Sequence, residues 1–118
     1  MSNGFLPYGR HWIDEDDIAA VAECLRGDWL TTGPAVEAFE AAFAAVVGTR
    51  HAVVVANGTI ALHLAAVAAG LGVGDTGIAP TMSFLASANG MRYTGADIAF
   101  ADADPHNGLV TPETFRAA

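Results

Sequence analysis

Apolar residues recur at helical spacing in the first half of the chain. Ile18, Val21, Ala22 and Leu25 stand at positions i, i+3, i+4 and i+7, the stripe of an amphipathic helix. Asp14 is a candidate N-cap for this helix, and Gly27 is a candidate stop. A second helix is predicted from Pro34 to Gly48, with a buried face made by Val36, Phe39, Phe43 and Val47.

From residue 52 onward the pattern changes to short apolar runs that alternate with helical stretches. It predicts strands over 52–56, 78–80 and 97–101, and helices that begin near residues 59, 83 and 111. Gly77 weakens the second strand, because glycine in a strand costs backbone entropy and contributes no side chain to packing. The alternation indicates βαβ units, and therefore an α/β fold with a mainly parallel sheet.

The first strand is predicted to end at Asn57-Gly58-Thr59, where a helix begins. Gly58 allows a tight turn and a close backbone approach, and Thr59 is a candidate helix cap. The unpaired N–H groups and the positive dipole end of a helix favour an anion, most often phosphate. A capped helix with nothing bound explains this turn equally well.

The second predicted strand is followed by Pro80-Thr81-Met82-Ser83-Phe84. In a parallel sheet, ligands bind beyond the carboxyl ends of strands, so Phe84 could face a planar ring whose phosphate reaches Gly58 and Thr59. Taken alone, Phe84 is as readily a core residue.

Composition narrows the class of protein. Apolar residues make up 53% of the 118 residues and charged residues 15%, which is typical of a globular domain. A net charge of −8 argues against binding nucleic acid. The single Cys24 allows no internal disulfide and favours the reducing cytoplasm, and the residues after Met1 contain no secretory signal.

The length of one apolar run and the absence of one residue type bear on function. The apolar run over 59–73 is too short for a membrane span and contains His63, so a fully buried helix is predicted there. The five basic residues are all arginine, and the chain has no lysine.

Five segments between Pro7 and about Arg116 form an ordered set of motifs: Pro7-Tyr8-Gly9-Arg10, Asp28-Trp29-Leu30-Thr31-Thr32-Gly33-Pro34, 57–63, 80–84 and Asp102-Ala103-Asp104-Pro105. In this order and spacing they resemble the DegT/DnrJ/EryC1/StrS family of nucleotide-sugar aminotransferases. It implies a pyridoxal 5'-phosphate (PLP) enzyme with the aspartate-aminotransferase-like fold, known as fold type I. It also implies an arm, first helix and substrate loop over 1–33, and an incomplete PLP-binding large domain over 34–118. The first two motifs are most similar to the branch that makes UDP-4-amino-4,6-dideoxy-N-acetyl-β-L-altrosamine in pseudaminic acid biosynthesis.

The same resemblance assigns roles to individual residues. Gly58 and Thr59 match positions that hold the phosphate of PLP, and Phe84 matches the aromatic that stacks on its ring. The residues that match the substrate side of the pocket are Tyr8, Leu30, Thr31 and Asn57. For Tyr8 and Thr31, an ordinary arm and an ordinary loop are equally good interpretations.

Other polar residues receive structural interpretations. His63 is expected to be a packed histidine rather than a catalytic base. The run Asp14–Asp17 is expected to be a solvated helix start rather than a metal site. Asp102 and Asp104 are expected to form turns.

The resemblance implies transfer of an amino group, usually from glutamate, to a nucleotide-linked 4-keto-6-deoxy sugar in a homodimeric enzyme. The family's Schiff-base lysine is absent from this chain, so no catalytic residue is assigned here and the chain alone is expected to be inactive. We interpret it as the N-terminal part of a longer protein. Two alternatives remain open, a same-family sugar 3-dehydratase that carries histidine in place of lysine, and a phosphate-binding module without catalysis.

Overall fold

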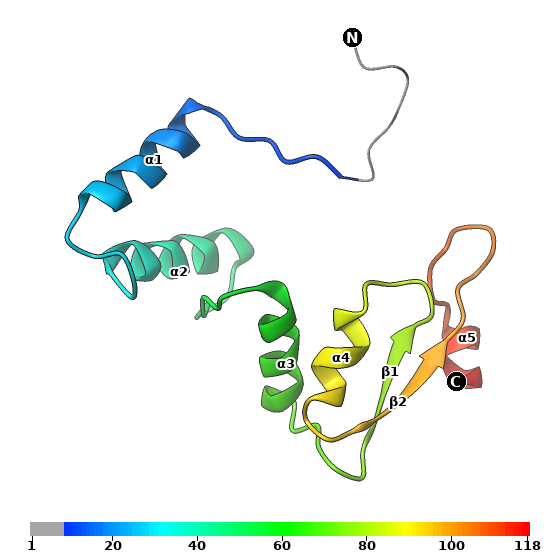
Figure 1. Ribbon diagram of the computed structural model, residues 1–118. Helices are drawn as coiled ribbons and strands as arrows, with labels where there is room; N and C mark the ends of the chain where they lie inside the picture. Colours follow the sequence, from blue (N-terminus) through cyan, green and yellow to red (C-terminus); the bar gives the residue numbers. More distant parts are fainter. Residues whose placement is uncertain (1–8) are drawn as a thin grey trace. The chain divides into compact units, whose positions relative to one another are not determined.

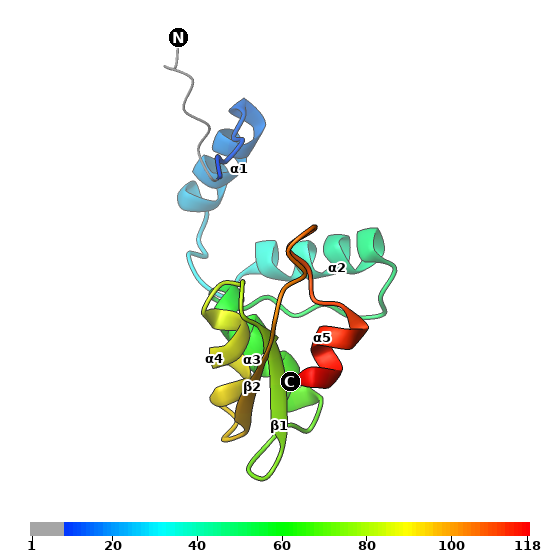
Figure 2. The same ribbon diagram turned by 90° about the vertical axis from the view of Figure 1, so that its right-hand side faces the viewer.

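The computed structural model describes residues 9–118, and the chain divides into two compact units, Met1–Val54 and Val55–Ala118. The described part of the first unit, residues 9–54, contains two helices, and the second unit contains three helices and a sheet (Figures 1 and 2). The elements of the first unit are α1 (Glu15–Arg26) and α2 (Pro34–Val47). Those of the second are α3 (Gly58–Ala68), β1 (Thr76–Pro80), α4 (Ala86–Arg92), β2 (Asp97–Ala101) and α5 (Pro112–Ala117).

Helix α1 begins where its acidic run predicts. The Asp14 side chain accepts hydrogen bonds from the N–H groups of Asp16 and Asp17, each at 3.1 Å. The Asp17 side chain in turn accepts from the Asp14 N–H at 3.1 Å, which completes a capping box. The N–H of Gly27 closes the other end on the carbonyls of Glu23 and Cys24. The predicted helix start and stop are confirmed.

Helix α2 also has the predicted bounds, with Pro34 in its first turn and Gly48 as a left-handed cap at φ 71°. The prediction that its apolar face is buried is wrong. Phe39 and Phe43 stack on each other with ring centroids 5.8 Å apart, yet Phe39 is 57% exposed and Ala44 is the one buried residue of the helix. Periodicity identifies the face, but residues 9–54 include no sheet to cover it.

Strands β1 and β2 of the second unit pair in parallel, with Thr76 opposite Asp97 and Pro80 opposite Ala101. The N–H of Thr81 donates to the carbonyl of Ala101 at 2.9 Å and continues the pairing past the end of β1. Helix α4 connects the two strands (Figure 1). The α/β class with a parallel sheet is therefore confirmed.

The strand predicted over 52–56 is absent from the described residues. The sheet contains β1 and β2, and Val53 is 76% exposed. A strand needs a neighbour to satisfy its backbone groups, and the N–H of Val54 donates instead to Oε1 of Glu40 at 2.8 Å. The Val-rich run has strand propensity, but no strand of the described chain pairs with it.

Small residues form the core of the second unit. Its buried apolar residues are all alanines, namely Ala66, Ala79, Ala86, Ala96 and Ala101. Gly77 of β1 and Gly90 of α4 are buried as well. Large apolar side chains of α3 remain accessible, with Leu62 45% exposed. The prediction of a fully buried α3 is wrong, because burial requires covering elements as well as an apolar sequence.

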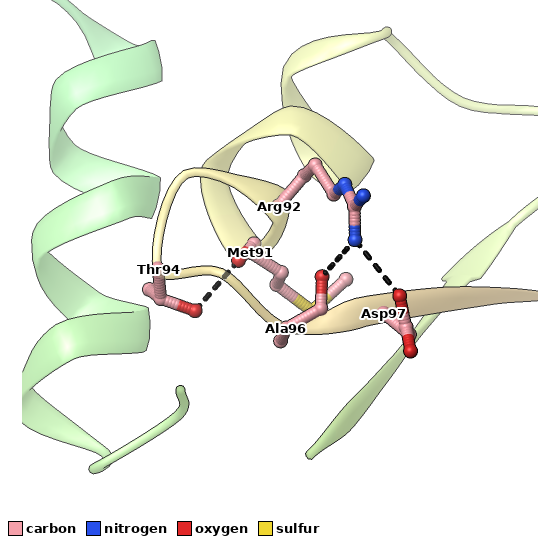
Figure 3. A network of polar contacts seen from close by, with 5 residues as sticks. All are labelled: Met91, Arg92, Thr94, Ala96 and Asp97. Atoms are coloured by element: carbon pink, nitrogen blue, oxygen red, sulfur yellow. Dashed lines mark hydrogen bonds and ion pairs between the residues drawn. The ribbon is translucent and has the colours of Figure 1, made fainter. Parts of the chain in front are cut away.

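Hydrogen bonds within the chain close the end of the second unit where α4 ends and β2 begins. Nη1 of Arg92 donates to the Ala96 carbonyl at 2.8 Å and to Oδ1 of Asp97 at 2.9 Å (Figure 3). The Thr94 hydroxyl donates to the Met91 carbonyl at 2.8 Å (Figure 3). The polar groups at this end are therefore engaged with one another.

Candidate functional site

The candidate site lies at the opposite end of the second unit, where the strands end and the helices begin. Strand β1 ends at Pro80, and the connection to α4 contains Phe84. Helix α3 begins at this same end of the unit as α4 (Figure 1). The sequence predicts this arrangement, because ligands of parallel sheets bind at the carboxyl ends of the strands.

Asn57, rather than Thr59, caps helix α3. Oδ1 of Asn57 accepts a hydrogen bond from the Ile60 N–H at 3.0 Å, and the helix itself begins at Gly58. The prediction that Thr59 is the cap is wrong by two residues. An asparagine in extended conformation reaches the third N–H of a helix as well as threonine does. The Thr59 hydroxyl lies in the first turn of α3, and the helix does not need it as a cap because Asn57 fills that role.

The first turn of α3 provides groups suited to a phosphate. Among residues 9–118, the backbone N–H groups of Gly58 and Thr59 donate no hydrogen bond to the protein. A Cβ placed on Gly58 would meet no atom within 4 Å, so the space beside this residue is open. Two free N–H groups, one hydroxyl and the positive end of an eleven-residue helix fit the phosphate group of PLP.

Phe84 lies in the connection between β1 and α4 and is 78% exposed. The interpretation of Phe84 as a core residue is thereby excluded for the described chain. The hydroxyls of Ser83 and Ser87, one on each side of Phe84 in the chain, lie 2.8 Å apart and link this connection to the first turn of α4. An accessible aromatic face in a locally fixed segment can stack on a planar ligand.

Sequence reasoning missed a polar pair at the ends of the two strands. The Thr81 hydroxyl donates to Oδ1 of Asp102 at 3.2 Å, directly after the paired residues Pro80 and Ala101. The available signal was position, since both residues immediately follow a predicted strand. This bond ties together the two loops that leave the sheet at the candidate site.

Asp104 forms the turn predicted for it. Its side chain accepts from the His106 N–H at 2.7 Å, and its carbonyl accepts from the Gly108 N–H at 2.7 Å. Asp102 accepts from the Ala103 N–H at 3.0 Å. The turn expected at Asp104 is confirmed, whereas the turn expected at Asp102 is wrong, because its Oδ1 bonds to the Thr81 hydroxyl of the neighbouring loop and the turn itself spans residues 105–107.

His63 is a packed histidine, as predicted. It is partly buried, and its Nδ1 donates to the Gly90 carbonyl of α4 at 3.2 Å. Its ring meets the Tyr93 ring edge to face, with centroids 5.7 Å apart. These contacts join α3 to α4.

Leu30 and Thr31 belong to the first unit, in the loop between α1 and α2. Both are exposed, and with Trp29 and Gly33 they line an open pocket of about 330 Å³. The next residue, Thr32, has a positive φ of 48°, a conformation that threonine rarely adopts. Tyr8 lies outside the described residues.

Two searches of residues 9–118 address other kinds of site. No group of three or more His, Cys, Asp or Glu side chains there could hold a metal ion. Within the same range, every helix is too short or too polar to span a membrane.

Comparisons with known proteins agree with the resemblance noted from the motifs. The chain is 43% identical over 116 residues to the spore coat polysaccharide biosynthesis protein SpsC of Bacillus subtilis (strain 168). The alignment covers 98% of this chain and 30% of SpsC, so the chain spans less than a third of the length of this relative.

Solved structures of sugar-modifying enzymes share the fold. The putative sugar aminotransferase Spr1654 from Streptococcus pneumoniae, in its PLP-form, superposes with a TM-score of 0.84 at 27% identity, over 96% of this chain and 29% of that one. The same protein matches in its PMP-form. A GDP-4-keto-6-deoxymannose-3-dehydratase superposes with a TM-score of 0.82 at 24% identity, over 95% of this chain and 31% of that one.

The sequence profile of one family matches residues 11–118, which is nearly the whole chain. This match is independent of the placement of individual site residues. Together with the 43% identity to SpsC, it settles the family. The chain belongs to the DegT/DnrJ/EryC1/StrS aminotransferase family.

Proposed function

We propose that this chain is the N-terminal part of a PLP-dependent aminotransferase that aminates a nucleotide-linked 4-keto-6-deoxy sugar for polysaccharide biosynthesis. The observation that carries the proposal is the first turn of α3, with free N–H groups at Gly58 and Thr59, at the end of the unit where the β1–α4 connection presents Phe84. Family membership and the sugar-aminotransferase relatives support it.

In this proposal, the described residues bind and orient the cofactor. The N–H groups of Gly58 and Thr59 and the Thr59 hydroxyl hold the phosphate, while Phe84 stacks on the pyridine ring. Phe84 is 78% exposed, so its ring is available for that contact. A stacked aromatic pair contributes roughly 0.5–1.5 kcal/mol beyond the effect of the surface area that it buries. We assign the substrate side to Tyr8, Leu30, Thr31 and Asn57.

Bound PLP supplies the carrier that takes an amino group from a donor, with glutamate proposed, and passes it to the keto carbon of the sugar. The sequence contains no lysine, so the covalent attachment of the cofactor is not provided by these residues. We propose that this chain by itself does not catalyse transamination. Residues 34–118 would form part of the cofactor-binding domain, and residues 1–33 the arm and substrate loop.

The finer assignments are proposals that follow the same resemblance. Similarity of the first two motifs supports a substrate of the pseudaminic acid type, and the relative SpsC supports surface polysaccharide biosynthesis more broadly. We propose a homodimer from the same resemblance, and a cytoplasmic location, with which the single Cys24 is consistent.

Replacement of the Thr59 hydroxyl tests the proposed cofactor site. In the full-length protein, Thr59→Val keeps the shape of the side chain and removes the hydroxyl, and we expect about tenfold weaker binding of PLP. Thr76→Val is the matched control, since Thr76 is exposed at the start of β1. Equal affinity of the two variants for PLP, measured by absorbance titration, would contradict the proposed role of Thr59.

The sugar 3-dehydratase remains the second candidate, because the fold is shared with an enzyme of that name. Product analysis with a nucleotide-linked keto sugar and glutamate separates the two reactions. An amino sugar in the product supports the aminotransferase. Loss of a hydroxyl without gain of nitrogen supports the dehydratase.

A further inference from the structure

Two glycines leave room for helix α4 to lie against its neighbours, because an added Cβ at either position would clash. A Cβ added to Gly90 would lie 2.8 Å from Cβ of Leu62 and 3.1 Å from the backbone nitrogen of His63, both in α3. A Cβ added to Gly77 of β1 would lie 2.6 Å from Sδ of Met91. Glycine therefore sets the approach of α4 to α3 on one side and to β1 on the other.

A polar contact reinforces the approach of α3 and α4 at the same level. Nδ1 of His63 donates to the carbonyl of Gly90 at 3.2 Å, which requires the tautomer protonated at Nδ1. The ring of His63 also meets that of Tyr93 at 83°. We call Gly90 and His63 the helix clasp.

The clasp connects the two elements that carry the proposed cofactor contacts. Helix α3 begins with Gly58 and Thr59, about one turn before His63. Helix α4 begins two residues after Phe84, and the Ser83–Ser87 hydroxyl contact fixes that segment to its first turn. A shift of α4 relative to α3 would therefore change the distance between the phosphate-binding turn and the stacking ring.

We propose that the helix clasp, Gly90 with His63, is a positioning device that sets the spacing between the phosphate-binding turn at Gly58–Thr59 and the aromatic ring of Phe84. This inference rests on the proposed function. PLP touches both points at once, so its affinity depends on their spacing. Inorganic phosphate touches the turn alone, so its affinity does not.

The test compares the two ligands in variants of the full-length apo-protein. Gly90→Ala places a methyl group against backbone atoms of α3, which cannot move as a side-chain tip could, and forces the helices apart by tenths of an ångström. We expect about tenfold weaker binding of PLP and less than about twofold change for inorganic phosphate. Gly72→Ala is the control, because a Cβ there meets no atom within 4 Å.

A second pair of variants keeps the test informative if Gly90→Ala does not fold. His63→Leu removes the hydrogen-bond donor, whereas His63→Asn keeps an N–H close to the position of Nδ1. We expect His63→Leu to lose affinity for PLP, and His63→Asn to recover most of it, with phosphate affinity unchanged in both.

Three outcomes would overturn the inference. Wild-type affinity for PLP in folded Gly90→Ala would show that spacing is not set by the clasp. Equal loss of PLP and phosphate binding would indicate general damage rather than positioning. Failure of the wild-type protein to bind PLP would remove the proposed function itself, a result distinct from the other two.

Discussion

Both ends of the second unit contain hydrogen bonds within the chain, including Thr81–Asp102 and Ser83–Ser87 at the end where α3 begins. They differ in the free backbone donors that the start of α3 adds at one end. At the end where α4 meets β2, Arg92 bonds to the Ala96 carbonyl and to Asp97, and the Thr94 hydroxyl bonds to the carbonyl of Met91 (Figure 3). At the end where α3 begins, the N–H groups of Gly58 and Thr59 donate no bond within residues 9–118. In the proposed function, these free donors and the positive end of the helix bind the phosphate of the cofactor.

We call the end where α4 meets β2 the closed end, and the end where α3 begins the open end. Changes at the closed end should alter stability and leave ligand affinity unchanged. Changes at the open end should do the reverse, unless they remove a helix cap. Four predictions follow this division in order of decreasing effect.

The largest effect concerns the 118-residue chain itself. Because it has no lysine, we expect no transamination with glutamate and a keto sugar, and no covalent PLP adduct on any side chain after borohydride reduction. Mass spectrometry of peptides from the reduced chain is the measurement, since it separates a side-chain adduct from one on the N-terminal amine. A reducible adduct on a side chain would contradict the assignment of the end where α3 begins as a non-covalent half of the site.

Phe84→Ala should weaken PLP binding to the full-length protein by about tenfold, because the ring loses its stacking partner. Phe84→Tyr should retain most of the affinity. Phe100→Ala is the matched control, as Phe100 is an exposed aromatic on β2 outside the connection to α4. The measurement is a fluorescence or absorbance titration with PLP. An equal loss of PLP affinity in Phe100→Ala and Phe84→Ala would contradict a specific role for Phe84.

Asn57→Ala should lower stability by about 1 kcal/mol, because the Ile60 N–H loses its capping partner. Asn57→Asp should cap the helix as well as asparagine and retain wild-type stability. Urea unfolding of the full-length protein measures the difference. An unchanged midpoint in Asn57→Ala would show that the cap contributes nothing.

Arg92→Met should have the smallest effect, at most about 1 kcal/mol of stability, since the side chains of Arg92 and Asp97 are 58% and 83% exposed. The destabilisation should shrink further at high salt as the ion pair is screened. PLP affinity should stay at the wild-type value. A tenfold change in PLP affinity would contradict the claim that substitutions at the end where α4 meets β2 leave ligand binding unchanged.

The parts of the fold that follow from local sequence were predictable. Asp14 and Asp17 make a capping box from residues three apart, and Pro34 and Gly48 delimit α2 by their own backbone preferences. The start of α3 was also predictable, because Asn57-Gly58-Thr59 marks the turn from which the helix begins. These features depend on a few neighbouring residues.

The parts that failed depend on residues far apart. The apolar run at 52–56 predicts a strand, but pairing requires a partner, and Glu40 takes the N–H of Val54 instead. Gly77 was interpreted as a weakness of β1, whereas its missing side chain makes room for Met91. The packing role of Gly77 cannot be inferred from the sequence, because it depends on the position of Met91 in α4.

A structure of the full-length protein with bound PLP tests the central claim most directly. We predict that the phosphate oxygens lie within hydrogen-bonding distance, about 3 Å, of the N–H groups of Gly58 and Thr59, and that the pyridine ring lies against Phe84. A phosphate held elsewhere, with the N–H groups of Gly58 and Thr59 bonded to other protein groups, would contradict the account.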